Sequence, residues 1–249
     1  MRAPRKRSEG EIYHVIARGT GRQLIFEDDS DRKRFLEYLS DDLRLYEAEL
    51  YAWCLMGNHV HLLIHASMDK LSKCMMHTCG QYARYYNEKS GRVGHLFQER
   101  FKSEPITDDE YLLTVIRYIH ANPAKAGLST IECYPWSSYG EYMGAPRLCK
   151  TEFPLSVFGG VESFKKFHEC EEESSCLDVG LPQDEFFALT DARAVEIAQA
   201  AIGDIATSDV KALPRAKRDE KLRLMKRAGL SVRQIERLTG VGRSTISRA

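Results

Sequence analysis

Residues 50–64, Leu-Tyr-Ala-Trp-Cys-Leu-Met-Gly-Asn-His-Val-His-Leu-Leu-Ile, predict two β-strands joined by a tight turn. Apolar and aromatic side chains fill both halves of this stretch, as they do in strands that are largely buried. Between the halves, Gly57-Asn58 is a two-residue loop of the kind that closes hairpins. We therefore expect a β-hairpin with strands over 50–56 and 59–64.

The second strand of this hairpin carries two histidines separated by one apolar residue. Side chains alternate between the faces of a strand, so His59 and His61 project together while Val60 and Leu62 face the core. Two imidazoles on one face can hold a single metal ion. From the residues alone, the pair would also suit a zinc hydrolase with a third ligand and a bound water, or a half-exposed strand without metal.

The segments around the hairpin predict an α+β domain. In chain order they are a strand over 12–18, a helix capped by Ser30 or an adjacent aspartate, the hairpin, a helix over about 70–88, a strand over 96–101 and a helix that begins at Asp108 or Asp109. This order is the ferredoxin-like split βαβ pattern, in which helices cover one face of an antiparallel sheet.

The helix after residue 108 carries further candidate functional residues. Its apolar stripe is formed by Leu112, Val115, Ile116 and Ile119. Tyr118 and Asn122 lie four residues apart and share a different face. Because Pro123 disfavours helical geometry in the residue before it, we expect Asn122 at a frayed helix end. The remaining histidines are expected in structural, packing or surface roles: His14, His65, His77, His95, His120 and His168.

The composition excludes several classes of protein. The 249 residues are 43% hydrophobic and 29% charged, which suits one large domain or two smaller ones. No apolar run is long enough to span a bilayer and no secretory signal is visible, so we expect a cytoplasmic protein with no membrane partner. The seven cysteines include no Cys-x-x-Cys pair, which favours reduced thiols over a disulfide framework.

The net charge of zero hides three unlike segments. Residues 1–150 carry 21 basic and 20 acidic side chains, residues 151–210 carry 3 and 13, and residues 211–249 carry 12 and 3. A compact basic segment is typical of nucleic-acid binders, although it can also be a solvated helix face. We therefore expect a domain over 1–146 with a basic N-terminal arm, an acidic linker or extension over 147–182, and a small all-α DNA-binding region over 183–249.

Five segments in this order resemble the single-tyrosine HUH transposases, and within them the branch of REP-associated tyrosine transposases. They are Tyr13-His-Val-Ile-Ala-Arg-Gly19, residues 53–64 around Asn58-His-Val-His61, Gly94-His-Leu-Phe-Gln-Glu-Arg-Phe-Lys102, Arg117-Tyr-Ile-His-Ala-Asn-Pro123 and Tyr134-Pro-Trp-Ser-Ser-Tyr139. Together they span residues 12 to about 143.

The resemblance implies a transposase that cuts and rejoins single-stranded DNA beside hairpins. His59 and His61, with Asn122 as third ligand, would hold Mg²⁺ or Mn²⁺. Tyr118 would be the nucleophile and would form a 5′-phosphotyrosine link while freeing a 3′-hydroxyl. Relatives of this kind act as monomers or as homodimers. A DNA-binding regulator that has kept the fold without cutting, and another HUH nuclease such as a replication initiator or a relaxase, are the alternatives.

Basic side chains around this domain would bind the DNA backbone. The candidates are Arg5, Lys6 and Arg7 of the N-terminal arm, with Arg18, Arg22, Arg100 and Lys102. The arm alone would equally suit a disordered solubilising tail.

The segment 230–248 has the pattern of a helix-turn-helix that would bind duplex DNA. Ser231 with Gln234 makes a capping box, and residues 239–241 make the turn. The candidate contacts are Arg233, Arg243, Ser244, Thr245 and Arg248.

Overall fold

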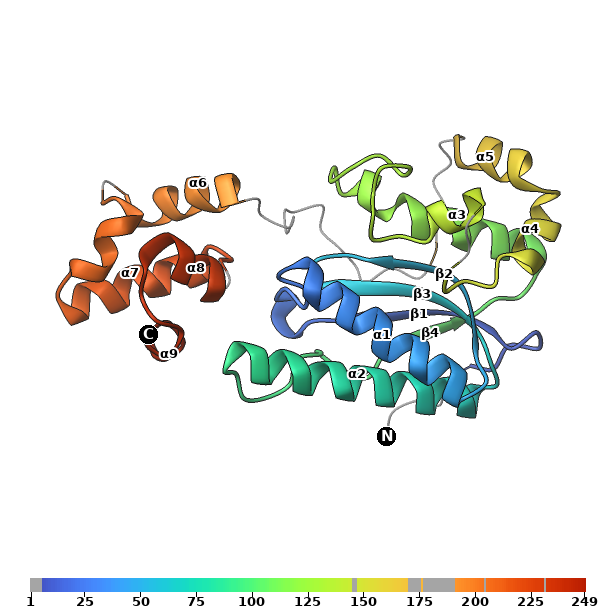
Figure 1. Ribbon diagram of the computed structural model, residues 1–249, viewed down its shortest axis with the longest axis horizontal. Coiled ribbons are helices and arrows are strands. Elements are labelled where there is room, and N and C mark those ends of the chain that lie inside the picture. The colour runs from blue at the N-terminus through green and yellow to red at the C-terminus, as the bar shows by residue number, and fades with distance from the viewer. Residues whose placement is uncertain (1–5, 145–146, 170–175, 177–190, 204, 231) are drawn as a thin grey trace. The chain divides into compact units, whose positions relative to one another are not determined.

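The computed structural model describes residues 6–144, 147–169, 176, 191–203, 205–230 and 232–249, without the side chains of 191–193 and 233 (Figure 1). Arg5 and Ser231, and the side chain of Arg233, therefore lie outside the described residues. The chain divides into one compact unit over 1–84 and 95–185 and another over 85–94 and 186–249. No described helix is both long and apolar enough to cross a membrane.

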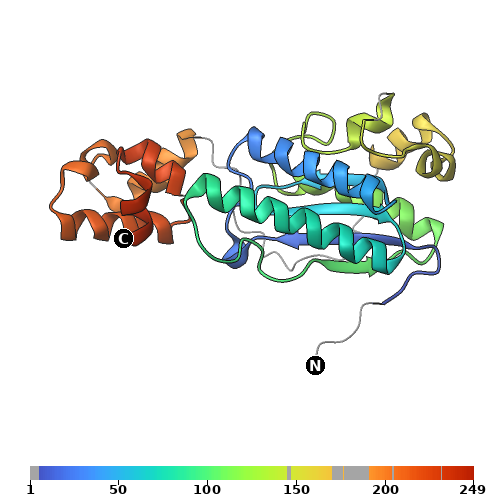
Figure 2. The same cartoon turned by 60° about the horizontal axis from the view of Figure 1, so that its bottom comes forward.

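The first unit is built on a four-stranded antiparallel sheet. Its strands are β1 (Ile12–Arg18), β2 (Glu49–Leu55), β3 (His59–His65) and β4 (Lys102–Pro105), and their order is β2-β3-β1-β4. Helices α1 (Asp29–Leu45) and α2 (Met68–Ser90) cover one face, and α3 (Asp109–Lys125) lies on the other (Figure 2). The expected split βαβ antiparallel sheet followed by a helical C-terminal region is confirmed. The expectation of helices on one face holds for α1 and α2 but not for α3, whose apolar residues pack with Cys54 and Leu63 on the opposite face.

The hairpin forms where the sequence predicts it, and its two-residue turn has no left-handed residue. Neither Gly57 nor Asn58 has a positive φ. Their carbonyl groups accept hydrogen bonds from the backbone N–H groups of Ile25, Phe26 and Gly19. The turn is therefore fixed by the chain that packs over it, and not by local glycine geometry.

Local side chains set the start of α1. The Asp28 carboxylate accepts a hydrogen bond from the Asp31 N–H, and the Asp31 side chain accepts from the Asp28 N–H, which is a reciprocal capping box. Ser30 lies inside the first turn, so the cap is the aspartate.

The predicted strand over 96–101 is wrong, because the strand that pairs with β1 is β4, from Lys102. The Leu96 carbonyl instead accepts hydrogen bonds from the Thr20 N–H and the Gln23 side chain. Leu96 and Phe101 are buried as anchors of this loop, which gave the segment its strand-like apolar pattern.

Helix α3 continues through Pro123 to Lys125, so Asn122 is not at a frayed end. The Asn122 Nδ2 donates a hydrogen bond to the Tyr118 carbonyl at 2.8 Å. Asn122 and Pro123 are both buried, and tertiary packing therefore overrides the local preference against a helix before proline.

The described part of 147–182 is a packed extension, and not a linker. Helices α4 (Glu152–Phe158) and α5 (Val161–Glu169) place Phe158 and Phe164 in the core that α3 shares with β2. The sequence did not predict these two helices, because the acidic run at 169–173 is more typical of a linker.

A buried histidine pair ties α5 to α3. His168 Nδ1 donates to the Phe164 carbonyl, and His168 Nε2 lies 3.0 Å from His120 Nδ1. His120 Nε2 in turn accepts from the Ser138 hydroxyl at 2.8 Å. His120 is therefore structural, as expected.

This pair predicts a decrease of stability in mild acid. Burial lowers the pKa of His168 from 6.5 to about 4, so between these values the unfolded chain binds more protons than the folded one. The free energy of unfolding should therefore fall as the pH drops through this window, by about 1.4 kcal/mol per pH unit for each such histidine. Urea unfolding of wild type and His168→Gln at pH 7 and pH 5 measures the effect. Equal decreases in the two proteins would contradict it.

The described part of the second unit is helical. It contains α6 (Asp191–Ile202), α7 (Arg215–Arg227), α8 (Val232–Thr239) and α9 (Arg243–Arg248) (Figure 1). Ala198, Leu222, Ile235 and Ile246 meet in its core. Between α8 and α9, Gly240 has φ +66°, a left-handed conformation that favours glycine at the end of a helix. The predicted helix-turn-helix pattern is therefore present in the backbone.

Candidate active site

The two histidines of the hairpin lie side by side on β3. His59 and His61 are buried, with ring centroids 4.9 Å apart. Among the residues that the structure describes, neither Nε2 atom has a hydrogen-bond partner. The pair thus presents two buried imidazole nitrogens with no acceptor or donor in the described part of the chain, which is unusual in a folded interior.

A third histidine, His14, joins this pair from the neighbouring strand β1. Its Nε2 lies 3.0 Å from His61 Nδ1, and the two rings stack with centroids 5.3 Å apart. Sequence reasoning assigned His14 to packing or the surface. The alternation of β1 and its antiparallel register with β3, which pairs His14 with Leu63, is the signal that places it on the His61 face.

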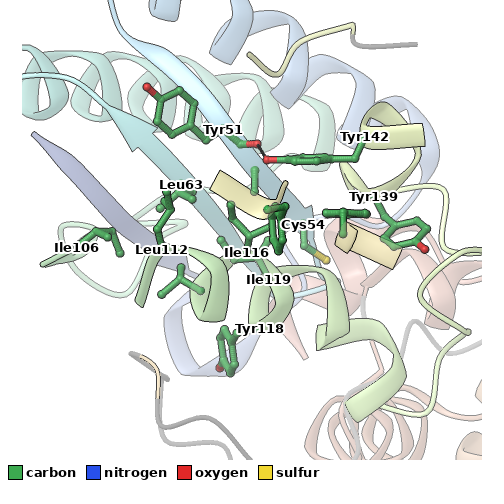
Figure 3. Close-up of a cluster of buried hydrophobic side chains, with 14 of the residues drawn as sticks. Tyr51, Cys54, Leu63, Ile106, Leu112, Ile116, Tyr118, Ile119, Tyr139 and Tyr142 are labelled. Carbon is green, nitrogen blue, oxygen red and sulfur yellow. Dashed lines mark hydrogen bonds between the residues drawn. The ribbon is translucent and has the colours of Figure 1, made fainter. Parts of the chain in front are cut away.

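Tyr118 approaches the histidines from α3. Its ring centroid lies 5.6 Å from that of His61 and 5.8 Å from that of His14, both in edge-to-face geometry. Figure 3 shows Tyr118 on a different side of α3 from Leu112, Ile116 and Ile119. The structure therefore brings the predicted nucleophile and His61 together.

Two cations near Tyr118 in sequence have different positions. Lys125 Nζ lies 4.6 Å from the centroid of the Tyr118 ring. Arg117 instead stacks on Phe167, at 4.3 Å, and donates to its carbonyl. Of the two, it is Lys125 that faces the phenol.

Asn122, the predicted third ligand, makes no described hydrogen bond with the histidine pair. It is buried on the same helix as Tyr118, but its side-chain amide donates its hydrogen bond back to the Tyr118 carbonyl. Among the described residues, no hydrogen bond links Asn122 to His59 or His61. Its role as third ligand stays a prediction.

Burial keeps the three histidines neutral. It lowers the pKa of His14 to about 3, and that of His59 to about 3 with a smaller contribution from Arg18. Burial also lowers the pKa of His61 strongly, with smaller effects from His59, His14 and Lys125. A neutral imidazole has one nitrogen lone pair free to bind a metal.

The predicted DNA-binding residues of the first unit have different environments. Arg18 is buried and lies opposite His59 in the β1–β3 register. Lys6, Arg7 and Arg100 are exposed, whereas Arg22 and Lys102 are partly buried. Arg18 is close enough to the histidines for its charge to help lower the pKa of His59.

The described DNA-binding candidates of the second unit lie on α9. Arg243 Nε donates to Glu236 at 2.6 Å, and Arg248 Nε donates to the Ser244 carbonyl at 2.9 Å. Ser244 and Arg248 are exposed, and Thr245 is partly buried.

Comparisons with known proteins give a consistent result. Residues 8–122 match the family described as transposase IS200 like. A Haemophilus influenzae protein classed as a REP-associated tyrosine transposase is 26% identical over 108 residues, which are 38% of this chain and 60% of that protein. A solved structure of a REP-associated tyrosine transposase bound to a REP hairpin superposes with a TM-score of 0.50 at 17% identity, covering 58% of this chain and 86% of that one. The last likeness establishes a shared fold.

Proposed function

We propose that this protein cleaves and rejoins single-stranded DNA at hairpin-flanked sites through a covalent 5′-phosphotyrosine at Tyr118, as the match of residues 8–122 to the IS200-like transposase family suggests. The observation that carries the proposal is the edge-to-face contact of Tyr118 with His61, beside two buried Nε2 atoms that lack partners among the described residues. A monomer and a homodimer are both compatible with it.

The residues present fit a divalent metal at the histidine pair. His59 Nε2 and His61 Nε2 are unpartnered among the described residues, and their rings are neutral, so each can offer a lone pair. We propose Mg²⁺ or Mn²⁺ there, with the Asn122 amide oxygen as third ligand, which leaves positions for water and phosphate. When bound, the ion would polarise a phosphate oxygen as a Lewis acid.

The chain's own groups account for the covalent step. The Tyr118 oxygen attacks phosphorus and forms an O–P bond, while the bond from phosphorus to the 3′ oxygen breaks. The phenol loses its proton, and the leaving 3′ oxygen takes up a proton to become a hydroxyl. Attack by a second 3′-hydroxyl on the phosphotyrosine reverses the step and joins strands, because the bond energy is kept in the link.

A covalent-adduct assay tests the proposal. The protein is incubated with a labelled single-stranded hairpin substrate and Mn²⁺ or Mg²⁺, and then separated on a denaturing gel. We expect a labelled band at the mass of protein plus one DNA fragment, which disappears with a chelator. Hairpin binding without any adduct, over a panel of hairpins and both ions, would instead identify a non-cleaving regulator.

Lys125 should accelerate formation of the adduct. Its ammonium group lies 4.6 Å from the centroid of the Tyr118 ring, where a positive charge would stabilise the negative charge that develops on the attacked phosphate. We expect Lys125→Met to slow adduct formation by about 10- to 100-fold and Lys125→Arg to retain most of the rate. Single-turnover kinetics measure this, with Lys73→Met on α2 as the matched control. A Lys125→Met rate equal to that of the control would contradict the role.

We further propose that the second unit binds duplex DNA through α9. The support is the helix-turn-helix backbone and the basic side chains of residues 211–249. The plot of log K against log salt has a negative slope, which should become shallower by about 0.9 for each phosphate that is no longer neutralised. The double variant Arg243→Gln/Arg248→Gln should therefore make the slope shallower by up to about 2. Fluorescence anisotropy with a labelled duplex measures the slope.

The matched control for this experiment removes two arginines from α1. Arg34 and Arg44 form ion pairs with Glu37 and Asp41 on the helix surface. The variant Arg34→Gln/Arg44→Gln therefore makes the same change in net charge within the first unit. Equal slopes for the two double variants would place the duplex contacts outside α9.

A further inference from the structure

The two histidines of β3 each have one ring nitrogen held by a neighbour. His59 Nδ1 lies 2.6 Å from Asn58 Oδ1, and His61 Nδ1 lies 3.0 Å from His14 Nε2. In both rings the opposite nitrogen, Nε2, has no partner among the described residues. Asn58 and His14 therefore occupy equivalent positions, one behind each histidine.

The Asn58 contact defines the proton position on His59. An amide oxygen can only accept a hydrogen bond, so His59 carries its proton on Nδ1 and has its lone pair on Nε2. The His14–His61 contact permits two arrangements, because a neutral imidazole nitrogen can donate or accept. If His61 Nδ1–H donates, the lone pair of His61 is on Nε2. If His14 Nε2–H donates, His61 Nε2 carries a proton and cannot bind a metal.

We propose that His14 is a positioning residue that accepts a hydrogen bond from His61 Nδ1–H and thereby presents the His61 Nε2 lone pair to a divalent metal. The inference rests on the proposed function, since it takes the His59–His61 pair as the metal site. His14 would then do what carboxylates and carbonyl groups do behind metal-bound histidines: accept the other ring N–H, and so fix the orientation and the proton position of the ring.

The form in which His61 Nδ1–H donates to His14 leaves one buried N–H group without a partner in the described part of the chain, so a bound metal is needed to favour this form. When His14 accepts at Nε2, its own proton is on Nδ1, and that buried atom has no partner among the described residues. In the opposite arrangement it is the His61 Nε2–H that has no partner among those residues. The two forms thus each leave a buried N–H unsatisfied, and a metal at His61 Nε2 stabilises only the first.

Metal affinity tests the role separately from catalysis. Mn²⁺ binding to the full chain is measured by electron paramagnetic resonance or calorimetry, without DNA. We expect His14→Leu, which removes the acceptor, to weaken Mn²⁺ binding by about 10- to 100-fold. His14→Gln, whose amide oxygen can accept from His61 Nδ1–H, should stay within a few-fold of wild type.

A matched control is available in the other buried histidine pair. His168 also lies 3.0 Å from a histidine and is buried, but it belongs to α5 and packs against Phe164 of the same helix. His168→Leu should leave Mn²⁺ affinity unchanged. Long-range ¹H–¹⁵N NMR with Mg²⁺ supplies a second measurement, in which His61 should carry its proton on Nδ1 in wild type and in His14→Gln.

The outcomes separate this inference from the function on which it rests. If wild type binds no Mn²⁺, or if His59→Ala binds it as tightly as wild type, the metal site itself is wrong. If wild type binds Mn²⁺ and both His14 variants match it, or both lose it equally, the hydrogen-bond role of His14 is overturned while the metal site stands. If His14→Leu does not fold, an Nε2–H proton on His61 in the Mg²⁺ spectra of wild type overturns the inference.

Discussion

Tyr118→Phe is expected to abolish the covalent protein–DNA adduct and to leave hairpin binding within a few-fold of wild type. The change removes only the phenolic oxygen, so the ring keeps its edge-to-face contacts with His14 and His61. Loss of a nucleophile that forms a covalent intermediate costs about 10⁴-fold or more in rate. Adduct yield on a denaturing gel and hairpin affinity in a mobility shift measure the two effects.

The same helix provides the control. Tyr111 lies two turns before Tyr118 on α3, and its hydroxyl donates to Glu104 at 2.7 Å, outside the histidine cluster. Tyr111→Phe should form the adduct at the wild-type rate. Persistence of the adduct in Tyr118→Phe would assign the nucleophile to another residue, while the metal site could still be tested.

Removal of the histidine pair should have the second largest effect. In His59→Ala/His61→Ala both buried Nε2 atoms are removed, so we expect no adduct at any Mn²⁺ or Mg²⁺ concentration that supports wild type. Hairpin binding in the presence of a chelator should remain, because it depends on phosphate and base contacts. Single variants should need higher Mn²⁺ concentrations, which distinguishes weakened binding from loss of fold.

A third histidine of β3 serves as the control for this pair. His65 lies at the end of the strand, with its side chain 39% exposed and 3.2 Å from Glu49. His65→Ala should therefore retain metal-dependent adduct formation. If the double variant still forms a chelator-sensitive adduct, the ion is held elsewhere.

The parts of the fold that could be predicted are those in which neighbouring residues of one segment carry the signal. The apolar runs on either side of Gly57-Asn58 predict the hairpin, and the alternation of side chains along a strand predicts the common face of His59 and His61. The four-residue step predicts the shared side of Tyr118 and Asn122. The strand β4 could not be found this way. It is a four-residue strand of Lys, Ser, Glu and Pro, and the apolar residues just before it are anchors of a loop.

Two members of the candidate site needed the tertiary structure. His14 belongs to it because β1 and β3 are neighbours in a particular register, which the sequence of either strand does not contain. Lys125 belongs to it because α3 runs unbroken through Pro123, against the local preference of the residue before a proline. In the first case long-range packing supplied a neighbour that the local pattern did not contain, and in the second it overrode the local preference.

Asn58 behind His59 and His14 behind His61 should differ in how easily evolution can replace them. Asn58 is adjacent to its histidine in the chain, whereas His14 is 47 residues away from His61. A gene that loses the acceptor behind His59 can regain it by changing the same hairpin turn. A gene that loses His14 must recover an acceptor on another strand, so substitutions there should be restricted to residues such as Gln that keep one in place.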